Sequence, residues 1–189
     1  FSLFLIYSYS RKIFGEEISF FSVIFIITSL LTISEIHQAK TDGVLFLTIT
    51  LCNVVILKAL NEKFLCFRDK LIFWVTFGFG ILVKGPIIII FTMLPLIGLC
   101  LLKKKNFFKE IWSPTGFIIF LIISIPWFII ITIVSKGLFW HESVIHDLFS
   151  KVKSGQESHG FPPGYYSLLF LVMFWPGVIF VPSLLKKIY

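Results

Sequence analysis

Long apolar runs separated by short charged clusters are the feature that most limits how this chain can fold. Seven such segments can be marked, at residues 1–9, 18–34, 43–57, 71–83, 87–102, 115–135 and 165–185. Only 14% of the 189 residues are charged, whereas soluble domains are about 25% charged. A soluble core of this size could not bury so much apolar surface. The runs therefore predict an all-α fold, a polytopic transmembrane helical bundle.

Two of these segments, 71–83 and 87–102, are short for a membrane span, which needs about 17–20 apolar residues. Only Lys84, Gly85 and Pro86 separate them. The region 71–102 could therefore form two short spans that meet at a tight turn, or one broken element. The sequence leaves both alternatives open.

The positions of the charged residues predict an orientation in the membrane. Alternate loops carry 12 of the 17 basic residues and five of the ten acidic ones, so one face carries a net charge of +7 and the other is neutral. The positive-inside rule places the basic face in the cytoplasm. The basic excess is then a topology signal, and no nucleic-acid partner is expected. All four histidines lie on the predicted outer face.

A first polar cluster follows the second apolar segment and runs from Glu35 to Gly43. If this stretch were helical, Glu35, Gln38 and Asp42 would share one face. Two carboxylates at a membrane boundary suit acid–base chemistry or metal binding. The alternative is a solvated turn, capped by Thr41 or Asp42 before the next helix. We take Glu35 and Asp42 as candidate catalytic residues.

A second feature is Lys84, a single lysine between two apolar runs. Ionisable residues at membrane depth usually face a cavity or an anionic partner, so Lys84 could bind a lipid-linked phosphate as a point charge. The alternative is a lysine that extends to the membrane surface.

The third feature is a long outer loop at residues 136–164, which holds three of the four histidines. Their spacing is not that of a metal site built on this loop alone. No metal ligand is assigned, although carboxylates and histidines on this face could hold a divalent metal.

Four stretches occur in an order that resembles a known family: 39–42 (AKTD), 82–86 (LVKGP), 125–128 (IPWF) and the region from Lys151 to Tyr166, with GQESHG at 155–160 and PPGYY at 162–166. Together they resemble the bacterial membrane glycosyltransferases of the protein O-mannosyltransferase and aminoarabinose transferase type, which have the GT-C fold. The resemblance implies an enzyme of the bacterial inner membrane with its active face in the periplasm. Such enzymes move a sugar from a polyprenyl-phosphate donor to a lipid or protein acceptor, among membrane lipids.

The resemblance also implies roles for particular residues. It places Asp42 among the acidic residues near the site and Lys84 near the lipid phosphate. The residues expected to bind substrate or phosphate are Lys40, Lys84, His146, Lys151, Glu157, His159 and Tyr165. Relatives of the aminoarabinose type have an arginine where this chain offers Lys151 and Lys153, and a lysine loses the bidentate geometry of an arginine.

We expect residues 1–189 to form a partial transmembrane glycosyltransferase domain, with both ends of the parent domain missing. In the family, the principal catalytic acid lies in the first outer loop, before the point where this chain begins. Two other interpretations stay open. One is a non-catalytic remnant or one piece of a split enzyme; the other is a membrane transporter or flippase, which would show polar residues deep within its spans.

Overall fold

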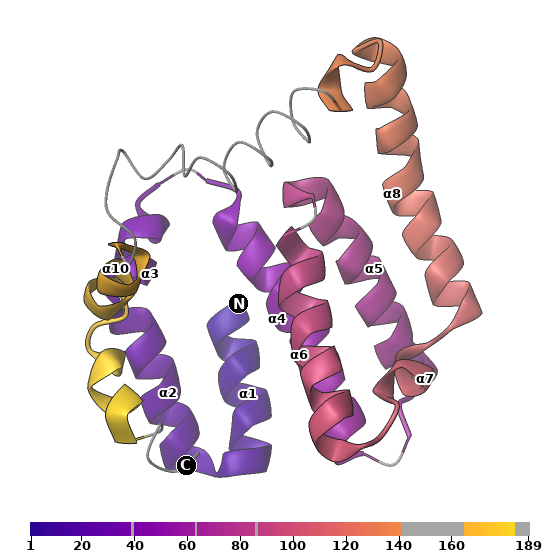
Figure 1. Cartoon of the computed structure of the whole chain (residues 1–189). Coiled ribbons are helices and arrows are strands. Elements are labelled where there is room, and N and C mark those ends of the chain that lie inside the picture. Colours follow the sequence, from indigo (N-terminus) through magenta and orange to yellow (C-terminus); the bar gives the residue numbers. More distant parts are fainter. Residues whose placement is uncertain (39, 63, 86, 141–164, 184–189) are drawn as a thin grey trace.

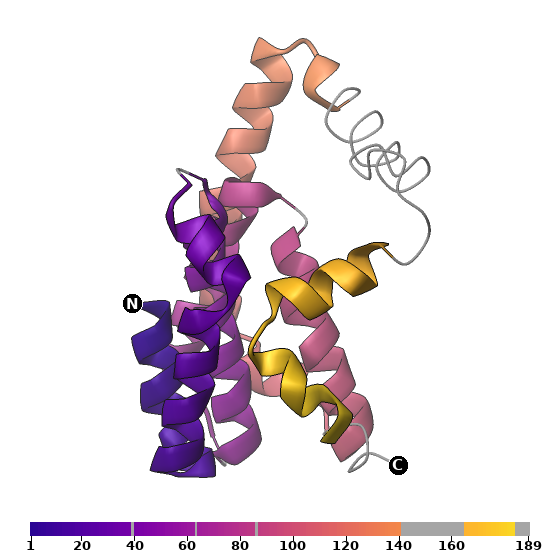
Figure 2. The same ribbon diagram turned by 90° about the vertical axis from the view of Figure 1, so that its left-hand side faces the viewer.

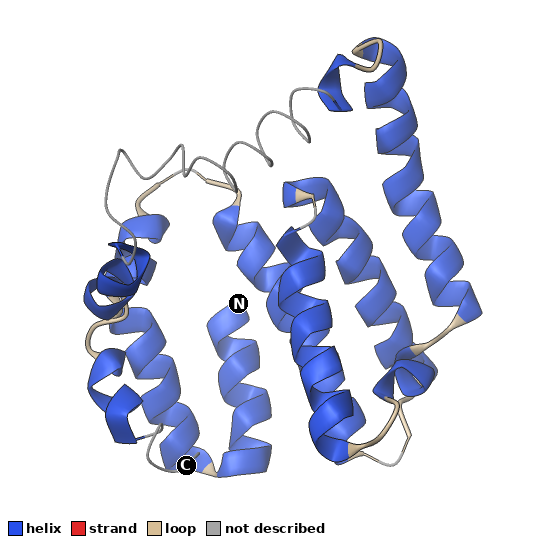
Figure 3. Cartoon of the chain, in the orientation of Figure 1, coloured by secondary structure: helices blue, strands red, loops and turns tan. Residues whose placement is uncertain are grey.

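The regular structure consists of helices, as predicted (Figures 1 and 3). The computed structural model describes residues 1–38, 40–62, 64–85, 87–140 and 165–183. The helices are α1 (Ser2–Phe14), α2 (Glu16–Thr28), α3 (Leu30–Ile36), α4 (Asp42–Asn61), α5 (Phe67–Lys84), α6 (Ile87–Lys103), α7 (Phe107–Ile111), α8 (Pro114–Val134) and α10 (Tyr165–Met173), followed by the 3₁₀ helix η2 (Gly177–Phe180).

Two of the predicted apolar segments are interrupted. Segment 18–34 contains α2 and α3, because Ser29 adopts an extended backbone and its hydroxyl accepts a hydrogen bond from the Thr32 amide at the start of α3. Segment 165–185 contains α10, which ends at Met173, and then η2. Pro176 separates the two and has no N–H with which to continue α10.

The region 71–102 forms two helices, α5 and α6, that make a helical hairpin. Gly85 ends α5 with a φ of 62°, a conformation that glycine adopts at little cost, and α6 begins at Ile87. The two helices pack against each other and against α4. Both helices are longer than the apolar runs 71–83 and 87–102 that predicted them. Helix α5 extends from Phe67 to Lys84, and α6 extends from Ile87 to Lys103.

Helix α5 is the centre of the bundle, with α4 and α6 on one side and α8 on the other. Glycines bring these helices close together. A Cβ on Gly80 would lie 2.0 Å from Cδ1 of Ile88 in α6, and one on Gly116 of α8 would lie 2.4 Å from Cδ1 of Trp74. The buried apolar core lies mainly between α4, α5, α6 and α7.

A polar side chain within the bundle compensates for a proline. Pro95 interrupts the hydrogen bonding of α6 and leaves the Phe91 carbonyl, four residues earlier, without its usual backbone donor. Asn53 of α4 donates its side-chain N–H to this carbonyl at 3.3 Å. The asparagine therefore links α4 to α6 at the point where the helix needs a donor.

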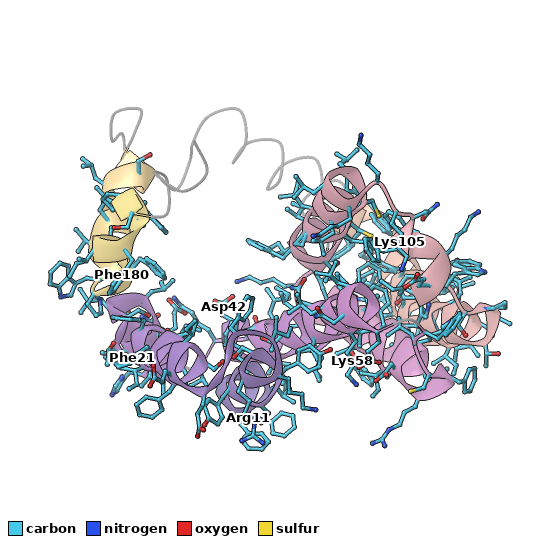
Figure 4. All side chains as sticks on the ribbon, turned by 90° about the horizontal axis from the view of Figure 1, so that it is seen from below. Arg11, Phe21, Asp42, Lys58, Lys105 and Phe180 are labelled. Carbon is cyan, nitrogen blue, oxygen red and sulfur yellow. The ribbon has the colours of Figure 1, made fainter. Side chains whose placement is uncertain are left out.

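Seen from below, the helices follow an arc with α10 at one end and α8 at the other (Figure 4). Helix α8 projects beyond its neighbours in both side views (Figures 1 and 2). Within the described residues, two helices are long and apolar enough to cross a membrane, α4 and α8, and α6 is a shorter apolar helix. The all-α prediction is confirmed, whereas these residues do not confirm seven spans.

Candidate functional site

The ends of the helices separate the charged residues into two groups. The basic end, at the bottom of Figure 1, is where α1, α4 and α6 finish and where Arg11, Lys12, Lys58 and Lys103 lie. The opposite end, here called the site end, is where α3 and α5 finish and α4 begins. Among the described residues, basic side chains that the sequence assigns to one face therefore lie together at one end of the bundle.

At the site end, Asp42 and Lys84 form an ion pair between two helices. Asp42 is the first residue of α4 and Lys84 is the last residue of α5. Lys84 Nζ donates a hydrogen bond to Oδ1 of Asp42. The Lys84 side chain is 40% exposed and the Asp42 side chain is 33% exposed, so solvent reaches both partners. Figure 4 shows Asp42 on the inner side of the arc.

A second ion pair lies in the connection between α3 and α4. Lys40 Nζ is 3.2 Å from Oε1 of Glu35. The other carboxylate oxygen of Glu35 is buried and has no hydrogen-bond partner among the described residues. His37 Nδ1 lies 2.7 Å from the Ile33 carbonyl oxygen. A carbonyl can only accept, so Nδ1 carries a proton and donates this hydrogen bond.

The structure corrects one detail of the sequence prediction. Glu35, Gln38 and Asp42 do not share one helix face, because α3 ends at Ile36 and α4 begins at Asp42. Residues 37–38 and 40–41, which lie between the two helices, are not helical. Thr41 occupies the N-cap position of α4 but its side chain makes no capping hydrogen bond.

The remaining predicted residues lie mainly in the outer loop. His146, Lys151, Glu157 and His159 are outside the described residues, and Tyr165 is the first residue of α10. In the part of the chain that the structure describes, no three histidine, cysteine or carboxylate side chains come together as metal ligands.

Two hollows open elsewhere on the molecule. One, of about 310 Å³, lies at the C-terminal end of α8 and is lined by Ile125, Phe128, Ile129, Thr132, Ile133 and Trp140. There Trp140 Nε1 donates to Oγ1 of Thr132 at 2.7 Å, and its ring lies 5.6 Å from that of Phe128. The other, of about 360 Å³, lies at the α6–α7 turn of the basic end. Sequence reasoning did not find either hollow; the only signal for the first was Trp140, an aromatic residue at a membrane boundary.

A comparison with protein families bears on what the site does. The family model described as dolichyl-phosphate-mannose-protein mannosyltransferase matches residues 1–130, which include both ion pairs of the site end. No curated protein and no solved structure matches the chain.

Proposed function

Because the chain belongs to the dolichyl-phosphate-mannose-protein mannosyltransferase family, a family of membrane glycosyltransferases, we propose that it moves a sugar from a polyprenyl phosphate to a lipid or protein acceptor. The observation that supports this most directly is the meeting of Asp42 and Lys84 at the site end. They supply a carboxylate that can take a proton and an ammonium that can stabilise a phosphate. A sugar transfer from phosphate to a hydroxyl needs both groups.

The proposed reaction is an inverting displacement. The acceptor hydroxyl oxygen attacks the anomeric carbon, and Asp42 takes the hydroxyl proton as general base. The bond between the anomeric carbon and the phosphate oxygen breaks, and its electrons remain on the departing polyprenyl phosphate. Lys84 stabilises that negative charge. In this scheme Glu35 is a second carboxylate able to orient the acceptor, and Lys40 adds positive charge near the phosphate.

The other assignments belong to the same proposal. His146, Lys151, Glu157, His159 and Tyr165 would bind the substrate from the outer loop and the start of α10. With the basic end in the cytoplasm, the positive-inside rule places the site end in the periplasm, at the bacterial inner membrane. Among the described residues, Glu35, His37 and Asp42 do not come together as ligands of one metal ion, and no step of the proposed reaction uses a metal.

Transfer of a radiolabelled sugar tests this function. Membranes that contain the protein, together with any chain encoded upstream at the same locus, are supplied with polyprenyl-phosphate sugars. Asp42→Asn and Lys84→Ala should each lower the transfer rate by about 100-fold, the typical effect of losing an acid–base group or an electrostatic stabiliser. Lys12→Ala removes an exposed charge at the basic end and should leave the rate unchanged.

Three outcomes would contradict the proposal. Retention of configuration at the anomeric carbon excludes direct displacement. Full activity in both site variants would remove Asp42 and Lys84 from the mechanism. Stable insertion with no transfer from any donor would favour the remnant or the transporter.

A further inference from the structure

Two ion pairs join α4 to α5, one at each end of the two antiparallel helices. At the basic end Lys58 Nζ lies 2.7 Å from Oδ1 of Asp69, and the Asp69 side chain is only 10% exposed. At the site end the partners are Asp42 and Lys84, with side chains 33% and 40% exposed. The less exposed pair, at the basic end, links α4 to α5 structurally. The exposed pair at the site end leaves its lysine accessible to a ligand.

The helix termini favour the pair in the absence of ligand. Asp42 stands at the N-terminus of α4 and Lys84 at the C-terminus of α5, and these are the ends where helix dipoles stabilise a negative and a positive charge, respectively. Lys84 is thus already neutralised by a neighbouring carboxylate. A phosphate that simply joined the intact pair would stand beside a like charge, which is unfavourable.

The backbone next to each member of the pair is open. Each member of the pair is followed by a glycine, Gly43 and Gly85, and a Cβ added at either position would meet no atom of the described residues within 4 Å. An anion could therefore approach the Asp42–Lys84 pair without displacing a side chain at these two positions.

We propose that Asp42 is an internal competitor for the donor phosphate at Lys84. Without donor, the Asp42 carboxylate occupies the lysine; when the donor binds, its phosphate takes the place of the carboxylate. This inference rests on the proposed function and adds an order of events to it. Asp42 becomes available to take a proton from the acceptor only after the donor has bound. The same exchange frees the general base and pairs Lys84 with the phosphate of the leaving group.

Binding of a polyprenyl phosphate without sugar tests this competition. The protein is placed in nanodiscs of phosphatidylcholine, and the affinity for the polyprenyl phosphate is compared with that for the uncharged polyprenol. Asp42→Asn should bind the phosphate up to about fivefold more tightly, because an exposed pair no longer has to be broken. Asp42→Glu should restore the original affinity, and Lys84→Ala should lose the preference for phosphate over alcohol.

Two controls separate competition from other effects. Glu110→Gln releases Lys105 from its partner, 2.6 Å away at the basic end, and should not change the affinity. In the double variant Asp42→Asn with Lys84→Ala the gain should vanish, because it depends on the lysine. Asp42→Ser, which suits a helix start, provides the same measurement if the asparagine variant does not fold.

The outcomes distinguish this inference from the proposed function. If the unmodified protein shows no preference for the phosphate over the alcohol, the proposed function fails and the competition fails with it. If it binds the phosphate but Asp42→Asn binds equally or more weakly, only the competition is overturned, and Asp42 instead holds Lys84 in position.

Discussion

At the residue scale, four ion pairs join charged side chains of the described residues, and the least exposed of these pairs is Lys58–Asp69 at the basic end. Asp69 accepts hydrogen bonds from Lys58 Nζ at 2.7 Å and from Cys66 Sγ at 3.1 Å. Burial by itself raises the pKa of Asp69, but these hydrogen bonds and the charges of Lys58 and Arg68 outweigh it. The pKa of Asp69 therefore lies below its usual range.

A lowered pKa predicts how stability depends on pH. The ionised Asp69 stabilises the fold above its unfolded pKa of about 3.9, and this stabilisation is lost as the pH falls through the lower folded pKa. Asp69→Asn should therefore lower the free energy of unfolding at pH 7 by about 1–3 kcal/mol, because it leaves Lys58 without its partner. Thermal unfolding in detergent at several pH values measures the difference, which should shrink in acid.

The control for Asp69→Asn is Glu62→Gln, which removes an exposed carboxylate at the same end. It should change the stability little. A difference between Asp69→Asn and the original protein that stays constant down to the lowest pH would show that the Asp69 charge is not responsible.

At the scale of elements, the contact between α5 and α8 depends on the absence of a side chain. Gly116 faces the Trp74 ring, and its added Cβ would lie 2.4 Å from Cδ1 and 2.9 Å from Cγ. The indole ring cannot move aside easily, because it packs edge-on against Trp112 and Phe117. Small residues that let backbones approach are typical of helix contacts in membranes.

Gly116→Ala should therefore destabilise the protein by about 1–3 kcal/mol, the usual cost of overpacking. The matched control is Gly98→Ala in α6, where an added Cβ meets no atom within 4 Å. There the alanine should leave the stability unchanged or raise it by up to about 1 kcal/mol, since alanine favours helix more than glycine does. Equal effects of the two substitutions on chemical denaturation would contradict this account of the α5–α8 contact.

At the scale of the whole molecule, the two ends of the bundle differ in charge and in chemistry. The basic end holds the lysines at the finish of α4 and α6, and the site end holds the Asp42–Lys84 pair. This arrangement predicts that the site end faces the periplasm.

Cysteine labelling on intact cells measures the orientation. Cys66 is exposed and belongs to the basic end, so a maleimide that cannot cross the inner membrane should not label it. In a Cys66→Ser background, Gln38→Cys at the site end should be labelled. Labelling of Cys66 without disruption of the membrane would reverse the orientation and place the proposed chemistry in the cytoplasm.

The sequence by itself determined the helical class, the separation of charges between the two ends, and the residues that resemble a glycosyltransferase family. Apolar runs and charged loops are local signals. In a membrane they are enough to predict helices and their direction, because an apolar segment must satisfy its own backbone hydrogen bonds and basic loops favour one side. Helix boundaries were less exact, because Ser29 ends α2 by a side-chain hydrogen bond inside an apolar run.

Only the tertiary structure decided which polar groups meet. Asp42 and Lys84 are 42 residues apart, and Asn53 reaches a carbonyl 38 residues away. Helices that are apolar on all sides show no stripe that distinguishes a protein-facing surface from a lipid-facing one. The packing of α4 against α5 and α6 is therefore set by close contacts such as that at Gly80, and these contacts bring the carboxylate to the lysine.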